Sequence, residues 1–278
     1  MESGTGVVAE LTLAGRVPGE AVMRELLRLQ ALDRPRSRVA RLLGRSPLTP
    51  QARPWFWGAL GEIAVGRVLA KLGPEWRVLH AVPVGERDSD VDHVVIGPGG
   101  VFTLNTKNHS GKDVWVAGRT FMVAGQRQDH IRNAEHEAAR AAKLLAAVVG
   151  RPVGVRPLVV VVEPKKLTIR DKPREVVVLT SGRLLRWFRR LDPVLTPAEV
   201  EQLTGAAGRP GTWSKTRVPT TDGASVRIAF DVLHREVTRA RWARTAWALG
   251  LIAALTLAGM TLLPAAITFV LSHAVHGR

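Results

Sequence analysis

Hydrophobic residues recur along this chain at two spacings, every second position in some segments and every third or fourth position in others. The first spacing is typical of β-strands and the second of amphipathic helices. With the glycine and proline stops between segments, these patterns predict helices at 18–32, 55–72, 131–149 and 182–191, and a helix that opens at Thr196. They predict strands at 76–84, 91–96, 101–107, 114–117, 120–123, 158–162, 176–179 and 225–230.

The order of these elements predicts a mixed α/β fold. A helix precedes an antiparallel meander, and a long helix then leads to the apolar strand LVVVV at 158–162, which has the composition of a buried central strand. We therefore expect one mixed sheet flanked by helices on both faces. The domain that contains this sheet is expected to span residues 55–206, followed by a linker or basic juxtamembrane segment at 207–245.

An uncharged apolar stretch occupies residues 246–271. Its 26 residues, at 1.5 Å per residue, form a helix longer than the roughly 30 Å hydrocarbon core of a bilayer. We predict a single transmembrane helix, in which a kink at Pro264 would be tolerated. Trp242 and Trp247 stand near its start, where aromatic belts lie. Four arginines precede the stretch and one follows it, which predicts a cell-membrane protein whose large N-terminal part faces the cytoplasm: Arg235, Arg239, Arg241 and Arg244 before it, and Arg278 after it.

Residues 1–54 have the character of a basic N-terminal arm. The segment 18–32 is an amphipathic helix candidate with Val22, Leu26 and Leu29 on one face. After it, arginines stand among prolines at 34–54, and we expect a mobile segment. Such an arm can contact DNA, contact anionic lipid, or simply be a solvated linker, and the sequence leaves all three open.

The charge balance narrows the choice of partners. Lys and Arg number 40 against 24 Asp and Glu, a net charge of +16, which suits nucleic acid or anionic lipid. The alternative is that an Arg-rich composition is basic without binding DNA. The chain has no Cys, which excludes disulfides and thiolate metal sites, and no Tyr, which excludes the commonest nucleophile for covalent DNA strand transfer.

The predicted hairpin at 91–107 gathers polar residues at its open end. If the loop Gly97–Gly100 closes it, Ile96 faces Val101, Asp92 lies opposite Asn105 and Asp90 lies opposite Lys107. Strand alternation then places Asp92, Asn105 and Lys107 on one face. A carboxylate with a second oxygen ligand can hold Mg²⁺ or Mn²⁺, and a nearby lysine can orient water or stabilise a phosphorane. The alternative is a cross-strand ion pair on a solvent face.

Four segments of the chain resemble the nuclease-related domain family, NERD, which is placed in the PD-(D/E)XK restriction-endonuclease-like superfamily. They are Gly61-Glu62 in a helix, WRVLH at 76–80, the block DSDVDHVVIGPGGVFTLNTKNHSGKDVWV at 88–116, and RNAEHEA at 132–138. The resemblance covers about residues 55–190. It implies a restriction-endonuclease-like fold, Asp92 as a metal-binding acid, Lys107 as the catalytic lysine, Glu62 as the helix glutamate of the metal site, and Mg²⁺ or Mn²⁺ as cofactor.

One position departs from the superfamily pattern. Asn105 stands where the motif usually has Glu or Asp, and an amide oxygen can bind a hard cation but brings no charge. Either Glu62 and Asp90 compensate, or the site is weak or inactive.

The histidines near the cluster are open to several interpretations. His93 is expected on the opposite strand face as a packed core residue. His109 could contact phosphate or act as a base, or be an exposed loop residue. His130 and His136 are six residues apart and do not form a helical metal pair.

Three other basic or polar features have a structural and a functional interpretation. The loop Gly97–Gly100 is a turn rather than a phosphate loop, because no helix start or GK[ST] follows it. The residues Gln126, Gln128 and Arg132 either meet a DNA backbone or form a loop and helix cap. The arginines of 183–190 form either a solvated helix face or a phosphate-binding surface.

Three functions remain open on these grounds. The first is a membrane-tethered, Mg²⁺-dependent nuclease acting on DNA, a hydrolase of ester bonds. The second is a catalytically weak or inactive module that binds DNA or protein at the membrane. The third is a structural membrane protein whose basic arm binds lipid.

Overall fold

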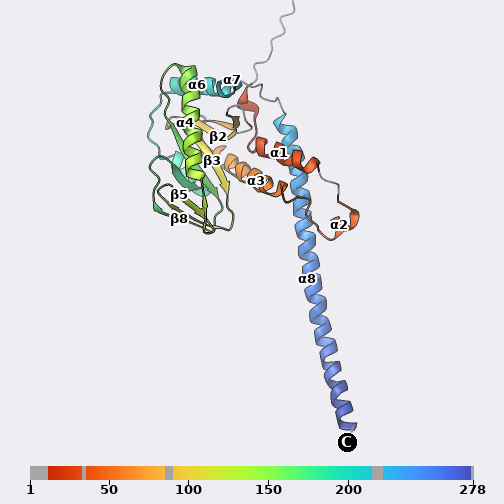
Figure 1. The fold of residues 1–278 in the computed structure, drawn as a ribbon. Coiled ribbons are helices and arrows are strands. Elements are labelled where there is room, and N and C mark those ends of the chain that lie inside the picture. The colour runs from red at the N-terminus through yellow and green to blue at the C-terminus, as the bar shows by residue number, and fades with distance from the viewer. Residues whose placement is uncertain (1–11, 33–35, 85–89, 215–221, 277–278) are drawn as a thin grey trace, which may run out of the picture.

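The computed structural model describes residues 12–32, 36–84, 90–214 and 222–276. Most predicted elements are present with ends within three residues of those expected. The fold is mixed α/β, but the strands form two sheets rather than the single sheet predicted (Figure 1). The residues 85–89 and 215–221, which belong to the predicted nuclease-like block and the predicted linker, lie outside the described residues.

The main sheet has the strand order β1-β2-β3-β7-β9. Its strands β1, β2 and β3 are antiparallel neighbours, while β7 and β9 run parallel to β3. The parallel strand β7 is almost wholly buried, as its apolar sequence predicts. The bounds are β1 Arg77–Pro83, β2 Asp90–Gly97, β3 Gly100–Asn108, β7 Val155–Val162 and β9 Val177–Thr180.

The second sheet has the order β6-β5-β4-β8. Its hairpin of β4 (Asp113–Ala117) and β5 (Thr120–Val123) was predicted, whereas β6 (Gln126–Gln128) and β8 (Lys166–Asp171) were not. The segment KLTIR at 166–170 alternates polar and apolar residues as a strand does, a signal that the sequence analysis missed, and the strand is mostly exposed. It forms because β4 offers a parallel edge.

Helices cover both faces of the main sheet. On one face, α3 (Ala52–Leu69) and α5 (Ser181–Phe188) bury Val95, Phe102 and Leu104. On the other face, α4 (His130–Val149) and α6 (Pro197–Gly208) bury Val94, Ile96 and Val101. The helix α6 opens at Thr196, as predicted, with a capping box formed by Thr196 and Glu199. The arginines of α5 stay exposed while Leu184 and Phe188 are buried, as on a solvated helix face.

The N-terminal segment packs against the body of the protein instead of forming a free arm. The short helix η1 (Leu13–Gly15) contacts β1, and α1 (Glu20–Ala31) packs on α3. Met23, Leu26 and Leu48 share a core cluster with α3 and with the first turns of the last helix. The short helix α2 (Arg38–Leu42) lies to the side of this layer, next to the last helix (Figure 1).

The last helix, α8, runs from Gly223 to His276 through Pro264. The strand predicted at 225–230 is therefore wrong, and residues 223–245 of the segment predicted as a linker at 207–245 are helical. The sequence SVRIAF alternates like a strand, yet Val226, Phe230 and Leu233 are spaced for one helix face and pack against α1 and α3. Beyond the body, α8 extends alone as a long exposed rod (Figure 1).

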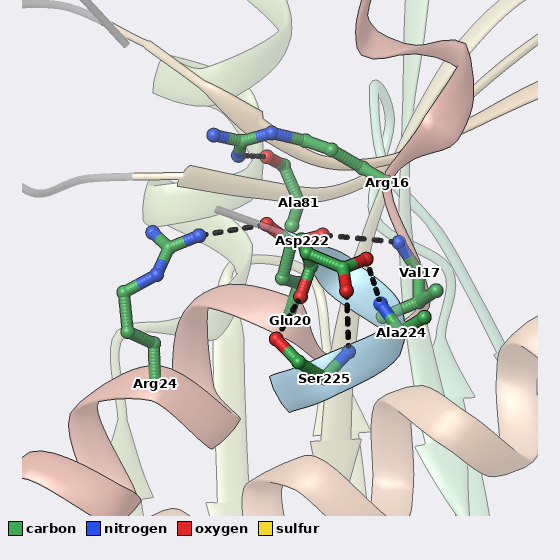
Figure 2. Close-up of polar contacts among 8 residues, drawn as sticks. All are labelled: Arg16, Val17, Glu20, Arg24, Ala81, Asp222, Ala224 and Ser225. Carbon is green, nitrogen blue, oxygen red and sulfur yellow. Dashed lines mark hydrogen bonds and ion pairs between the residues drawn. The ribbon is translucent and has the colours of Figure 1, made fainter. Parts of the chain in front are cut away.

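Separate sets of polar contacts lie side by side where α8 and α1 begin (Figure 2). The Asp222 carboxylate accepts hydrogen bonds from the backbone of Ala224 and Ser225, which caps α8. Beside it, the buried Glu20 accepts hydrogen bonds from Val17 N and from Arg24. A Cβ on Gly223 would lie 2.7 Å from Glu20 Oε2, so the two helix starts approach closely here. The first turns of α8 are held against the body by packing on α1 and α3.

Candidate metal and catalytic centre

The hairpin of β2 and β3 has the register that the sequence predicts. Ile96 pairs with Val101, Val94 with Thr103, and His93 with Leu104. The ladder ends there, so the expected pairs of Asp92 with Asn105 and of Asp90 with Lys107 fall beyond it. Past this point, in the described part of the chain, β3 continues its ladder with β7, and Asp90 is paired with Pro83 of β1.

Asp92 accounts for the opening between the strands. Its Oδ2 accepts a hydrogen bond of 2.5 Å from the backbone N–H of Thr106 on β3. The carboxylate thus satisfies a donor that a continued ladder would have used. Burial raises the pKa of Asp92, although Lys107 and the Thr106 hydrogen bond act in the opposite direction. The opening is therefore lined by an acid held between two strands.

Glu62 reaches the same opening from α3. The helix approaches β3 closely because Gly61 has no side chain: a Cβ there would lie 3.0 Å from Asn108 Cβ. Asn108 Nδ2 also donates to the carbonyl of Trp57, which fixes α3 against β3. Glu62 is 5% exposed, and burial raises its pKa well above its ordinary value. The negative charges of Asp92 and Asp90 raise it further, while Lys107 lowers it.

Glu137 of α4 is a member of this cluster that the sequence analysis missed. Its Oε1 accepts a hydrogen bond of 2.7 Å from Asn105 Nδ2. Burial and then the charge of Asp92 raise the pKa of Glu137 to about 7, against the effects of Asn105 and Lys107. The helix periodicity could have indicated it. Ala134, Ala138 and Ala141 form the buried face of α4, and residue 137 lies at the edge of that face.

Lys107 is the cation shared by these acids. Its charge lowers the pKa of Asp92, Glu62 and Glu137 alike, so its side chain lies near all three. The structure therefore brings together four predicted residues, Glu62, Asp92, Asn105 and Lys107, and adds Glu137. Asp90 acts on Glu62 from the neighbouring end of β2.

Two histidines border the cluster on the side of the second sheet. His109 Nε2 lies 3.2 Å from His130 Nε2, and the two rings are stacked with centroids 5.4 Å apart. Burial, with the nearby positive charges of Lys112 and Lys107 on His109, lowers its pKa to about 4. Burial, Lys107 and His109 lower the pKa of His130 to about 3. His109 is thus a packed neutral residue rather than an exposed loop residue, and His130 is its unpredicted partner.

The remaining histidine interpretations are settled by packing. His93 is fully buried, and its Nδ1 lies 2.9 Å from Nδ1 of His80. Burial lowers the pKa of both residues, for His80 to about 4. His93 is therefore a core residue, as predicted. Arg132 forms an exposed ion pair with Asp129 at the start of α4, while Gln126 and Gln128 lie in β6, so the loop expected there is a strand.

The donor set suits a hard divalent cation. Three carboxylates and an amide converge, and all of them offer oxygen, the ligand atom that Mg²⁺ and Mn²⁺ prefer. Asn105 Oδ1 is buried without a hydrogen-bond partner, and three acids share one lysine. Within the described ranges, however, no group of three or more His, Asp or Glu side chains is already arranged to hold a metal ion. The residues fit a cation chemically, and closing around one would require their side chains to move.

Comparison with known proteins places this centre in a family. Residues 57–162 match NERD, the nuclease-related domain. An uncharacterized protein of Bacillus anthracis is 37% identical over 84 residues, which are 29% of this chain and 38% of that protein. The chain thus matches well under half of that relative's length. No solved structure matches the chain significantly. The match spans every residue of the cluster, from Glu62 to Glu137, and residues 57–162 of this chain are a nuclease-related domain of the NERD family.

Proposed function

We propose that this protein is a membrane-tethered nuclease that hydrolyses phosphodiester bonds of DNA with Mg²⁺ or Mn²⁺. The observation that supports this most is the convergence of three carboxylates, an amide and one lysine at the open end of the β2–β3 hairpin. Groups with pKa values displaced in this way are more frequent at functional sites than elsewhere. The restriction-endonuclease-like fold implied by the family resemblance belongs to the same proposal.

Each residue of the cluster has a role in this proposal. Asp92, Glu62 and Glu137, with Asn105 Oδ1, would hold the cation. When bound, the cation would stabilise the charge that develops on the phosphate and make water more acidic. Lys107 orients the attacking water or stabilises the phosphorane. His109 and His130, neutral at pH 7, stand beside Lys107 and can accept a hydrogen bond or a proton.

Glu137 offers an answer to the missing acid at position 105. The hydrogen bond from Asn105 to Glu137 places a carboxylate beside the position where the motif usually carries one. The ligand set then has the same number of carboxylates as the usual motif, but the one missing from β3 is supplied by α4. Asn105 then acts both as an oxygen ligand and as the donor that orients Glu137.

The tether in this proposal is α8. It is long and apolar enough to cross a membrane by length and composition, and its most apolar 18-residue window is not buried at all. Exposure of so long an apolar surface is costly in water and ordinary in lipid. The arginines before the stretch support an orientation in which the nuclease-related domain faces the cytoplasm.

A non-catalytic module that binds DNA or protein at the membrane is the second candidate. It is favoured by the engaged amide of Asn105 and by the absence of a ready-made three-ligand group among the described residues. This candidate predicts binding that weakens with salt, with no cleavage in any divalent metal.

The deciding experiment is a cleavage assay on the full chain in lipid nanodiscs, with Mg²⁺, Mn²⁺ or EDTA. We expect metal-dependent cleavage of DNA that Asp92→Ala and Lys107→Ala abolish. Asp129→Ala and Lys112→Ala, which remove an acid and a lysine outside the cluster, should leave it intact. Cleavage that persists in the first two variants would refute the assigned centre, and binding without cleavage would support the second candidate.

A further inference from the structure

The short helix α2 carries an apolar stripe on its outer surface. Val39 and Leu42 of α2 and the residue that caps it, Leu43, stand at positions i, i+3 and i+4, so they lie on the same side. They are 64%, 66% and 55% exposed. Three large apolar side chains exposed together on a well-defined helix are a feature of interaction surfaces rather than of a solvated linker.

The structure holds α2 firmly against α8. Trp247 Nε1 donates a hydrogen bond of 2.9 Å to the carbonyl of Leu42, and Arg36 pairs with Glu236 at 2.7 Å. Gly44 has a φ of +70°, and a Cβ there would lie 2.7 Å from Ala240 O and from Arg244 N. Only glycine allows this turn and this approach. These contacts fix α2 beside residues 240–247 of α8, and Figure 1 shows α2 next to α8.

The surroundings of the stripe are strongly basic, and the nearby acid Glu236 is paired with Arg36. The sequence has no Asp or Glu between Asp33 and Glu62, and none after Glu236. Exposed arginines lie on and beside α2 and on the adjoining turns of α8: Arg38, Arg41, Arg45, Arg239, Arg241 and Arg244. A partner that meets both the apolar stripe and these arginines must be apolar inside and anionic at its surface.

The position along α8 identifies that partner as a lipid bilayer. The uncharged stretch begins at Ala246, one residue before the tryptophan that contacts Leu42. Trp242 and Trp247 are 71% and 53% exposed at the same level, as in an interfacial aromatic belt. Apolar side chains with flanking arginines are the composition of a helix that lies in the membrane interface.

We propose that α2 inserts Val39, Leu42 and Leu43 into the headgroup region of an anionic bilayer while its arginines bind lipid phosphates. This inference rests on the proposed passage of α8 through the membrane and adds a second contact to it. With two contacts the nuclease-related domain is held at one orientation, because rotation or tilt about α8 would withdraw α2 from the lipid.

The absence of cysteine from the chain makes the test direct. Single-cysteine variants of the full chain are labelled with an environment-sensitive fluorophore and reconstituted in phosphatidylcholine vesicles with or without phosphatidylglycerol. The reporter is Leu42→Cys, with Val39→Cys as a second reporter if the first disturbs folding. Leu255→Cys reports on the apolar stretch. Val194→Cys, 68% exposed on the loop that bonds to the Pro98 turn, is the aqueous control.

In anionic vesicles we expect the label at 42 to be quenched by headgroup nitroxide lipids and protected from aqueous iodide. The label at 255 should be quenched by nitroxides deep in the acyl chains, and the label at 194 by iodide alone. Each arginine near an anionic surface contributes to binding about fivefold. Protection at 42 should therefore fall severalfold in neutral vesicles and in the Arg38→Gln/Arg41→Gln/Arg45→Gln variant.

The outcomes separate this inference from the proposed tether. A label in lipid at 255 with an aqueous label at 42 overturns the role of α2 and keeps the membrane passage. An aqueous label at 255 overturns both. Protection at 42 by duplex DNA instead of vesicles would assign the arginines to nucleic acid and would also overturn the inference.

Discussion

Glu137 gives the most direct test of the electrostatics of the cluster. Its pKa is 4.5 in its ordinary state and about 7 in the folded protein, and each pKa unit corresponds to about 1.4 kcal/mol. The native state therefore binds a proton more tightly than the unfolded chain does. The free energy of unfolding therefore falls as the pH rises from about 4.5 to about 7. Above pH 7 the whole penalty for a charged, buried Glu137 is present.

Replacing Glu137 by Gln removes that cost and keeps an oxygen for the Asn105 amide. Allowing for the partial exposure of the side chain, we expect Glu137→Gln to stabilise the protein by about 2–3 kcal/mol at pH 8.5. Near pH 4.5 the two proteins should differ little. The difference at pH 8.5 corresponds to about 4–10 °C in melting temperature for a protein of this size.

Thermal unfolding of the detergent-solubilised full chain at several pH values measures this difference. Glu135→Gln is the matched control, because Glu135 lies on the same helix but pairs with the exposed Arg119. We expect saturating Mg²⁺ to stabilise the wild type at pH 8.5 and to reduce the advantage of Glu137→Gln. A variant that is less stable than the wild type at pH 8.5, or that shows no dependence on pH, would refute this account of the cluster.

Three further substitutions test the cluster of acids with Lys107 and the packing of α8 against α3. Asn105→Glu adds a carboxylate beside Glu137. The melting temperature without metal should fall by several degrees at pH 8, while cleavage in excess Mg²⁺ should rise. A fall in both quantities would show that the amide is needed. Lys107→Ala should reduce cleavage by about 100-fold or more but keep the rise in melting temperature that Mg²⁺ causes. Loss of that rise would contradict a lysine that acts on the reaction and does not hold the metal. Phe230→Ala, buried against Phe56, should cost about 3–5 kcal/mol in urea unfolding. Its control Ile228→Ala, 65% exposed on the same helix, should cost about 0.5 kcal/mol or less, and equal losses would contradict this packing.

The first turns of α8 show that packing against distant segments can override a local sequence pattern. The sequence SVRIAF at 225–230 alternates in polarity, and the alternation predicted a strand. The helix wins because Val226, Phe230 and Leu233 fill a core formed by α1 and α3, two elements almost two hundred residues away. The N-terminal arginine-rich segment was likewise expected to be free, but Leu48 and Ala52 are buried in that same core.

The sequence by itself determined the elements of the nuclease-related domain, the register of the β2–β3 hairpin, the cluster of Asp92 with Lys107, and the apolar stretch of α8. Each of these is set by a periodicity, a turn or a composition within a few neighbouring residues. Only the tertiary structure decided that α4 adds Glu137 to the centre, that the strands divide into two sheets, and that α2 lies beside the first apolar turns of α8. These depend on which surfaces meet across long separations in the chain, where packing and the desolvation of charge outweigh local preference.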